Sequence, residues 1–169
     1  ARLQAPLTVR LACLCHDLGK GNTPADVLPR HIGHEARSVK LLRELCDHWR
    51  VPRDCRELAE VVAREHGHSH QSPHLSAPAT LRLLERCDAI RRPARFAEVL
   101  LACECDARGR LGHADDTYPP ATRLQRALDA ALGRDLDQTL AVLQRLRLDA
   151  QLAALDAGAA ADNCLHPDA

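Results

Sequence analysis

The chain has 169 residues, enough for one domain with a substantial buried core. Its 23 basic and 23 acidic residues cancel, which excludes a strong overall field of the kind that draws proteins to nucleic acids or membranes. No apolar run approaches the ~20 residues of a membrane-spanning helix, and no secretory signal opens the chain. We therefore expect a cytoplasmic protein without membrane contact.

The composition favours packed helices over sheets. Trp49, Phe96 and Tyr118 are the only aromatic residues, so the core must be built from Leu, Ala, Val and Cys. The eight cysteines include no CxxC pair and fall mostly at helical core positions, which predicts free buried thiols in a reducing compartment. A metal or redox role for some of them is the alternative. The chain does not begin with Met, and we expect a fragment of a longer protein.

The first predicted helix contains an unusual ionisable pair. Residues 7–18 are apolar nearly all round, which predicts a buried helix, yet His16 and Asp17 lie within them. A buried carboxylate is too costly to keep ionised alone, so it needs a metal, a hydrogen-bonded base or a cation. Gly19 and Gly21 should end the helix just beyond the pair.

Two further helices each carry an inward-facing histidine. After a loop, residues 34–49 have His34 and Trp49 on one apolar face, with charged residues mostly opposite. Residues 54–66 follow, and the apolar stripe of this helix ends in His66. We expect both histidines on the buried side.

Residues 67–78 combine histidines, serines and prolines, which predicts a loop. We expect its histidines, like His31, to be loop residues that could bind Ni or Zn adventitiously: His68, His70 and His74.

Two carboxylates lie on or beside the core stripes of the next helices. The pattern predicts a helix over residues 79–90 with Asp88 at its edge, and another over residues 93–108 with Asp106 on the core face. Residues 112–120 read as a polar loop.

The C-terminal part is rich in Leu and Ala and predicts one or two helices over residues 121–157, followed by a frayed end over residues 157–169. We therefore divide the chain into a domain of residues 1–120 and a helical tail of residues 121–169.

Four helices thus bring metal-competent side chains toward one core. Ligands from separate helices converge naturally inside a bundle, and a mixture of imidazole and carboxylate suits a catalytic divalent metal. The candidate ligands are His16, Asp17, His34, His66 and either Asp106 or Asp88.

The run Cys15-His16-Asp17-Leu18-Gly19-Lys20 resembles the signature of the HD superfamily of metal-dependent phosphohydrolases. More narrowly, HDLGKG, TPADVLPRHIGHE, VAREH and ECDARGR look like the C-terminal HD domain of bacterial CCA-adding enzymes, a family of tRNA nucleotidyltransferases. The resemblance covers about residues 3–120. It implies an all-α HD-domain helical bundle, to which the predicted tail is added.

The resemblance also implies chemistry. Enzymes of this family add or repair the CCA end of tRNA from CTP and ATP with Mg, and their HD domain is credited with phosphatase, 2′-nucleotidase and 2′,3′-cyclic phosphodiesterase activities. His16 and Asp17 match the defining metal ligands, His34 and His66 the additional histidines, and Asp106 the last aspartate, which favours Asp106 over Asp88. The metal would be Ni, Mn or Mg.

Two departures from the family limit what this chain can do. The first histidine of the family's H…HD…D pattern precedes the HD pair, and none of the fifteen residues before His16 is a histidine. The nucleotidyltransferase core is also absent, so CTP, ATP and its Mg would be bound by a part that this chain lacks.

Three basic residues are candidates for phosphate contact. Lys20 could neutralise a substrate phosphate, although a lysine at a helix C-terminus is also favourable by itself. Arg108 and Arg110 could touch a tRNA backbone or form surface ion pairs. The first hypothesis is therefore a metal-dependent phosphohydrolase acting on a phosphomonoester or cyclic phosphodiester, with catalytic His16, Asp17 and Lys20. The second is a non-catalytic helical module that positions tRNA.

Overall fold

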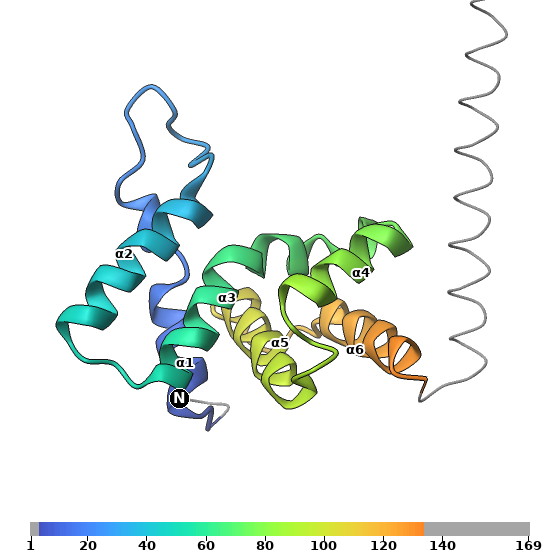
Figure 1. The fold of residues 1–169 in the computed structure, drawn as a ribbon. Helices are drawn as coiled ribbons and strands as arrows, with labels where there is room; N and C mark the ends of the chain where they lie inside the picture. The colour runs from blue at the N-terminus through green and yellow to red at the C-terminus, as the bar shows by residue number, and fades with distance from the viewer. Residues whose placement is uncertain (1–3, 134–169) are drawn as a thin grey trace, which may run out of the picture.

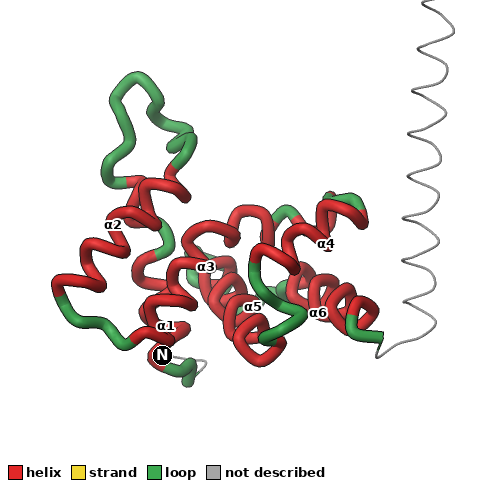
Figure 2. Tube along the Cα trace, viewed as in Figure 1, coloured by secondary structure: helices red, strands yellow, loops and turns green. Residues whose placement is uncertain are grey.

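A computed structural model describes residues 4–133 and is helical throughout that range, with no strand (Figure 2). This confirms the predicted all-α fold. None of the described helices is both long and apolar enough to cross a membrane. The elements are α1 (Leu7–Cys15), the 3₁₀ turn η1 (Leu18–Lys20), α2 (His34–His48), α3 (Arg53–His70), the 3₁₀ turn η2 (Ser72–His74), α4 (Ala77–Arg86), α5 (Pro93–Arg108) and α6 (Pro119–Ala131).

Helix α3 is the centre of the bundle, because it contacts each of the other five α-helices of the described range (Figure 1). Its sequence explains this position. The predicted stripe from Cys55 through Leu58 and Val62 to His66 is buried along the whole helix. Helices α1 and α2 both pack on α3, and the loop between η1 and α2 projects away from the bundle (Figure 2).

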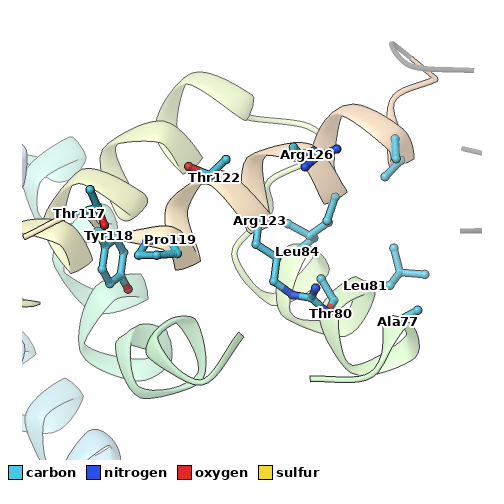
Figure 3. Close-up of a pocket in the computed structure, with 13 residues that line it drawn as sticks. Ala77, Thr80, Leu81, Leu84, Thr117, Tyr118, Pro119, Thr122, Arg123 and Arg126 are labelled. Atoms are coloured by element: carbon cyan, nitrogen blue, oxygen red, sulfur yellow. The ribbon is translucent and has the colours of Figure 1, made fainter. Parts of the chain in front are cut away.

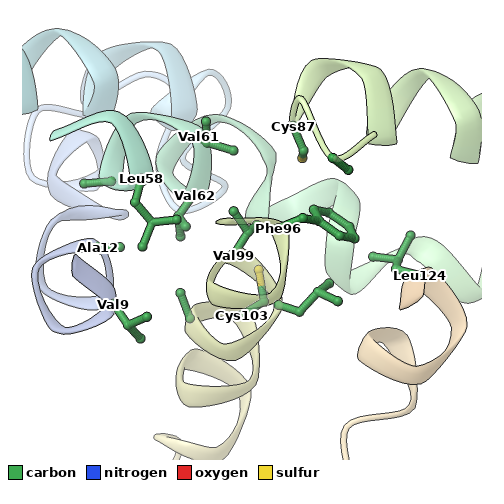
Figure 4. Packing of buried hydrophobic residues seen from close by; sticks show 14 of the residues in the cluster. Val9, Ala12, Leu58, Val61, Val62, Cys87, Phe96, Val99, Cys103 and Leu124 are labelled. Carbon is green, nitrogen blue, oxygen red and sulfur yellow. The ribbon is translucent and has the colours of Figure 1, made fainter. Parts of the chain in front are cut away.

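The core joins side chains from most of the helices (Figure 4). Phe96 is the largest fully buried side chain and lies between α3 and α6. Small and branched side chains fill the rest, as the composition predicts, and they include Val9, Ala12, Leu58, Val62, Cys87, Val99, Cys103, Leu124 and Leu128. All seven cysteines in the described range are free, and five of them are buried, which confirms the predicted free thiols for those residues.

Helix α6 covers the start of the segment predicted to be a helical tail, residues 121–169. It packs against α4 and α5. Its Leu124 and Leu128 are fully buried in the same core as the other helices. The start of the Leu/Ala-rich segment is therefore packed with the HD helices. Residues 134–169, which hold the rest of that predicted segment and the end predicted to fray, lie outside the described residues.

Three predicted helix ends were wrong. Helix α1 ends at Cys15, before the HD pair and not just beyond it, because the backbone leaves the helical conformation at Asp17 (φ −107°, ψ 11°). Helix α3 continues to His70, where the sequence predicted a loop, because Ser69 is buried and its hydroxyl donates to the carbonyl of Glu65 at 3.1 Å. Tertiary contacts here outweigh the low helix propensity of Gly67. Helix α4 ends at Arg86 and not at residue 90, because the chain turns at Asp88, whose φ is 55°.

Three apolar residues predicted to face the core are exposed. Leu7 and Leu14 of α1 are 63% and 77% exposed, and Trp49 is 73% exposed. Helix α1 contacts α3 and α5, so only its Val9, Ala12 and Cys15 side is covered. Trp49 follows the last residue of α2 and is no longer on the face that this helix buries.

Candidate metal centre

The HD pair lies where α1 ends and η1 begins. His16 is the residue that caps α1, and Asp17 precedes the 3₁₀ turn, so the pair lies at a break between two helical segments. His16 is buried, and His66 reaches the same place from the second half of α3. His34 reaches it from the first residue of α2.

All three histidines are held in the same way. The Nδ1 atom of each ring lies close to a backbone carbonyl oxygen of its own segment: 2.9 Å for His16, 3.1 Å for His34 and 3.0 Å for His66. Because a carbonyl only accepts, Nδ1 carries the hydrogen in each neutral ring and Nε2 presents a lone pair. A histidine that binds a metal through Nε2 is typically fixed in this manner.

The three Nε2 atoms converge on the carboxylate of Asp17. His34 and His66 approach Oδ1 at 3.3 and 3.6 Å, and His16 approaches Oδ2 at 3.2 Å. The buried Nε2 atoms of His16 and His34 and the Oδ1 of Asp17 have no hydrogen-bond partner. Lone pairs that are buried, unpartnered and directed at one point call for a cation between them.

The donor set fits a divalent metal. One ligand atom from each of His16, Asp17 and His66 lies within 4.8 Å of the others. Imidazole nitrogen favours transition metals, and the carboxylate offsets the charge of the ion. These three residues therefore form a possible His/Asp/His site for a divalent ion.

The electrostatics of the site also favour a positive charge at its centre. Burial lowers the pKa of His16, but its close contact with the carboxylate of Asp106 and the charge of Asp17 outweigh burial and raise that pKa. Burial, reinforced by the nearby His16, lowers the pKa of His66. The carboxylates thus attract a cation, whether a proton on His16 or a metal ion, while His66 is kept neutral as a ligand must be.

Asp106, and not Asp88, reaches this cluster. The Oδ1 of Asp106 lies 3.4 Å from the Nε2 of His16. Asp88 instead pairs with three arginines near the turn after α4: Arg91, Arg92 and Arg95. The close contact with His16 and the hydrogen bond from His70 hold the pKa of Asp106 far below its usual range.

Lys20 lies beside the site. Its Nζ forms an ion pair with the Oδ2 of Asp17 at 2.6 Å, one turn along the chain. This hydrogen bond and the charge of His16 together overcome the burial of Asp17 and lower its pKa. The side chains of Lys20 and Asp17 are 42% and 31% exposed, so this ion pair lies where the site meets the solvent.

The two candidate phosphate-binding arginines lie at the end of α5. The guanidinium of Arg108 is used within the chain, by Glu104 at 2.7 Å and the carbonyl of Ala114 at 2.9 and 3.0 Å. Arg110 is exposed. Both line a small cavity of about 230 Å³ that His70 also borders, so they lie near the cluster and not inside it.

Two residues at the site were not predicted as members of it. His70 pairs with Asp106 at 2.8 Å, and the hydroxyl of Tyr118 lies 2.8 Å from the other ring nitrogen of His70. The spacing of four residues between His66 and His70 was a signal, because it places both on one face of a helix. The signal was missed because residues 67–78 were predicted to form a loop, in which this spacing has no helical meaning. Tyr118 carried no comparable signal.

A second cavity, of about 640 Å³, lies between α4 and α6 and away from the histidines (Figure 3). Its walls are mostly apolar, with Leu81 and Leu84 from α4 and Ala127 from α6, and Arg123 and Arg126 at its edge. Tyr118 lines one end of it (Figure 3).

The sequence of the chain is similar to a known domain family and to several known proteins. The HD domain family matches residues 2–107. The chain is 69% identical over 130 residues to the Multifunctional CCA protein of Acidovorax sp. (strain JS42), which is 77% of this chain and 31% of that protein. It is 63% identical over 141 residues to the protein of the same name from Polaromonas naphthalenivorans (strain CJ2), 83% of this chain and 33% of that one.

The protein of that name from Verminephrobacter eiseniae (strain EF01-2) is 68% identical over 131 residues, 78% of this chain and 32% of that protein. The chain therefore spans about a third of the length of the relatives it matches. No solved structure matches it significantly. The resemblance to the HD domain of CCA-adding enzymes, predicted from the motifs, is confirmed.

Proposed function

Because the chain belongs to the HD domain family, we propose that it is a metal-dependent phosphohydrolase domain with the ligands His16, Asp17, His34, His66 and Asp106. The observation that carries this proposal is the convergence of three histidine Nε2 atoms on the carboxylate of Asp17, with the buried Nε2 atoms of His16 and His34 and the buried Oδ1 of Asp17 unpartnered. A Ni, Mn or Mg ion held there would polarise a phosphoryl oxygen and make a water molecule acidic enough to attack phosphorus near neutral pH.

The other residues at the site would orient the ligands and neutralise the charge of the substrate. The backbone carbonyls fix the rings of His16, His34 and His66, so the ligands are oriented before anything binds. Lys20, half-exposed beside Asp17, is placed to neutralise an oxygen of a phosphate that enters from solvent.

We further propose that the substrates are phosphoesters at RNA ends or on nucleotides, in a longer protein that takes part in CCA addition to tRNA. This follows from the name shared by the relatives, Multifunctional CCA protein. CTP and ATP would then be bound by the part of such a protein that lies outside this chain. The other hypothesis, a module that only positions tRNA, needs free cations near the site, and Arg108 is already engaged within the chain.

The test is hydrolysis of a 2′,3′-cyclic nucleotide, a 2′-nucleotide and a phosphomonoester by the 169-residue chain with Ni, Mn or Mg. We expect metal-dependent turnover that Asp17→Asn reduces to background, while Asp26→Asn, in an exposed loop, leaves it unchanged. Lys20→Ala should lower turnover, and Lys40→Ala, the other lysine of the chain and exposed, should not. Full activity of Asp17→Asn would disprove the site.

A further inference from the structure

His70 differs from the other three histidines around the site. It lies on α3 one turn after His66, and the two ring centroids are 6.0 Å apart. Neither of its ring nitrogens contacts a backbone carbonyl. Nε2 lies 2.8 Å from the Oδ2 of Asp106, and Nδ1 lies 2.8 Å from the hydroxyl of Tyr118. Its contacts are thus to side chains from α5 and from the residue that precedes α6.

The direction of these hydrogen bonds follows from the chemistry of the groups. The ionised Asp106 can only accept, so Nε2 of His70 carries the hydrogen and donates it. In a neutral ring Nδ1 then accepts, and the hydroxyl of Tyr118 donates to it. Burial raises the pKa of the Tyr118 hydroxyl, which keeps this donor protonated.

The two carboxylate oxygens of Asp106 therefore make different contacts. Oδ2 is occupied by His70, whereas Oδ1 faces the Nε2 of His16 at 3.4 Å, on the side of the cluster. A carboxylate held through one oxygen cannot rotate freely about its own bond. The other oxygen is thereby directed at the site.

We infer that His70 and Tyr118 are positioning residues, which fix the carboxylate of Asp106 so that Oδ1 is presented as a ligand atom. The inference rests on the proposed metal site. His70 is not itself a ligand in this arrangement, because the Nε2 that would bind a metal already donates to Asp106. The hydrogen bond between His70 and Tyr118, which are 48 residues apart in the chain, also connects the start of α6 to the site.

The test is the affinity of the 169-residue chain for Ni²⁺, measured by competition with a chelator. His70→Ala should weaken binding roughly 10–100-fold, as is typical when the partner of a metal ligand is removed. His70→Gln keeps a donor near the position of Nε2 and should recover part of the loss. Tyr118→Phe removes a single hydroxyl and should cost less than His70→Ala. His68→Ala, an exposed histidine on the same helix, is the matched control and should bind like the parent chain.

A double-mutant cycle separates positioning from direct ligation. If His70 acts through Asp106, then His70→Ala has no further effect on Ni²⁺ affinity in a chain that already carries Asp106→Ala. If the two losses add, His70 binds the metal itself and the inference is overturned. Thermal unfolding of each metal-free variant shows whether it is folded, and Tyr118→Phe keeps the test available if His70→Ala is not.

Failure of this inference and failure of the proposed function give different results. If the parent chain binds no Ni²⁺, both are overturned. If the parent chain binds Ni²⁺ and the His70 and Tyr118 variants bind it equally well, only the positioning role is overturned.

Discussion

Gly19 packs against His34 so closely that a methyl group on the Cα of Gly19 would overlap the carbonyl oxygen of His34. The same methyl group would lie 2.5 Å from the backbone nitrogen of Ser38. The amide of Gly19 donates to the Ser38 hydroxyl at 2.9 Å, and its carbonyl accepts from the Nε of Arg37 at 3.0 Å. Only glycine lets the turn after Asp17 sit on the first turn of α2, and this contact sets the distance between Asp17 and His34.

We therefore expect Gly19→Ala to push η1 away from α2. The added methyl group meets backbone atoms, which cannot move aside cheaply, so the change should cost about 1–3 kcal/mol of unfolding free energy. It should also weaken Ni²⁺ binding, because Asp17 and His34 move apart. Denaturant unfolding and metal titration measure the two effects.

Gly21→Ala is the control for that substitution. A methyl group on Gly21 would come no closer than 3.5 Å to the carbonyl oxygen of Leu18, and the φ of Gly21 is −63°, which alanine adopts readily. Stability and metal binding should stay near those of the parent chain. Equal losses in both variants would mean that the close packing of Gly19 is not the cause.

That the candidate ligands lie close together could be predicted from sequence, because most of them lie on helices with regular apolar stripes. His66 ends the stripe that begins at Cys55, and this fixes its direction without knowledge of the fold. The apolar stripe of its own helix does not place His34 in the cluster. That prediction also needed the knowledge that this helix packs beside the HD pair. The apolar stripes alone left Asp106 and Asp88 both open, and the choice of Asp106 came from the resemblance of ECDARGR to the family motif.

Other features depended on tertiary contacts that the sequence does not display. Leu14 and Trp49 are apolar, yet they are exposed, because periodicity defines an apolar face but does not say whether another helix covers it. His70 lies after Gly67 in a polar stretch, and it is helical because Ser69 is buried and because Asp106 holds its ring. Composition alone favoured a loop there.

Removal of Arg86 should destabilise the bundle. Glu65 is 1% exposed, and both of its carboxylate oxygens accept from the Nε of Arg86 at 3.0 Å. Arg86→Ala would leave a buried carboxylate without its main cation, at a cost of about 1–3 kcal/mol. The matched variant is Arg82→Ala, an exposed arginine on the same helix, which should leave the denaturation midpoint unchanged. Equal midpoints for the two variants would refute the importance of the pair.

The metal-free protein should lose stability in acid partly through Asp106. Its pKa lies far below the usual value of 3.8, because His16, 3.4 Å from one carboxylate oxygen, and the hydrogen bond from His70 to the other favour the ionised form. In acid the unfolded chain therefore binds a proton at this residue before the folded chain does. The stabilisation is present above the unfolded pKa and is lost as the pH falls through the range below it.

With a chelator present, Asp106→Asn should consequently show a shallower fall of unfolding free energy between about pH 5 and pH 3 than the parent chain. Asp26→Asn, an exposed aspartate without an ion pair, should keep the parent slope. If Asp106→Asn follows the parent curve in parallel, the hydrogen bonds of Asp106 contribute nothing to acid stability.

Leu124 and Leu128 test whether α6 belongs to the structural core. Both are fully buried, although the sequence assigned them to a tail beyond residue 120. Truncation of either leucine to alanine removes apolar contacts and leaves a cavity, which typically costs about 2–5 kcal/mol. Leu111→Ala, at a leucine that is completely exposed, should change stability little. Urea unfolding of the three variants, followed by circular dichroism, gives the comparison.

A single cooperative transition with a lowered midpoint for Leu124→Ala and Leu128→Ala would show that α6 unfolds together with α3 and α5. An unchanged main transition would show instead that α6 is an independent appendage, and Tyr118 could then not hold His70 through it.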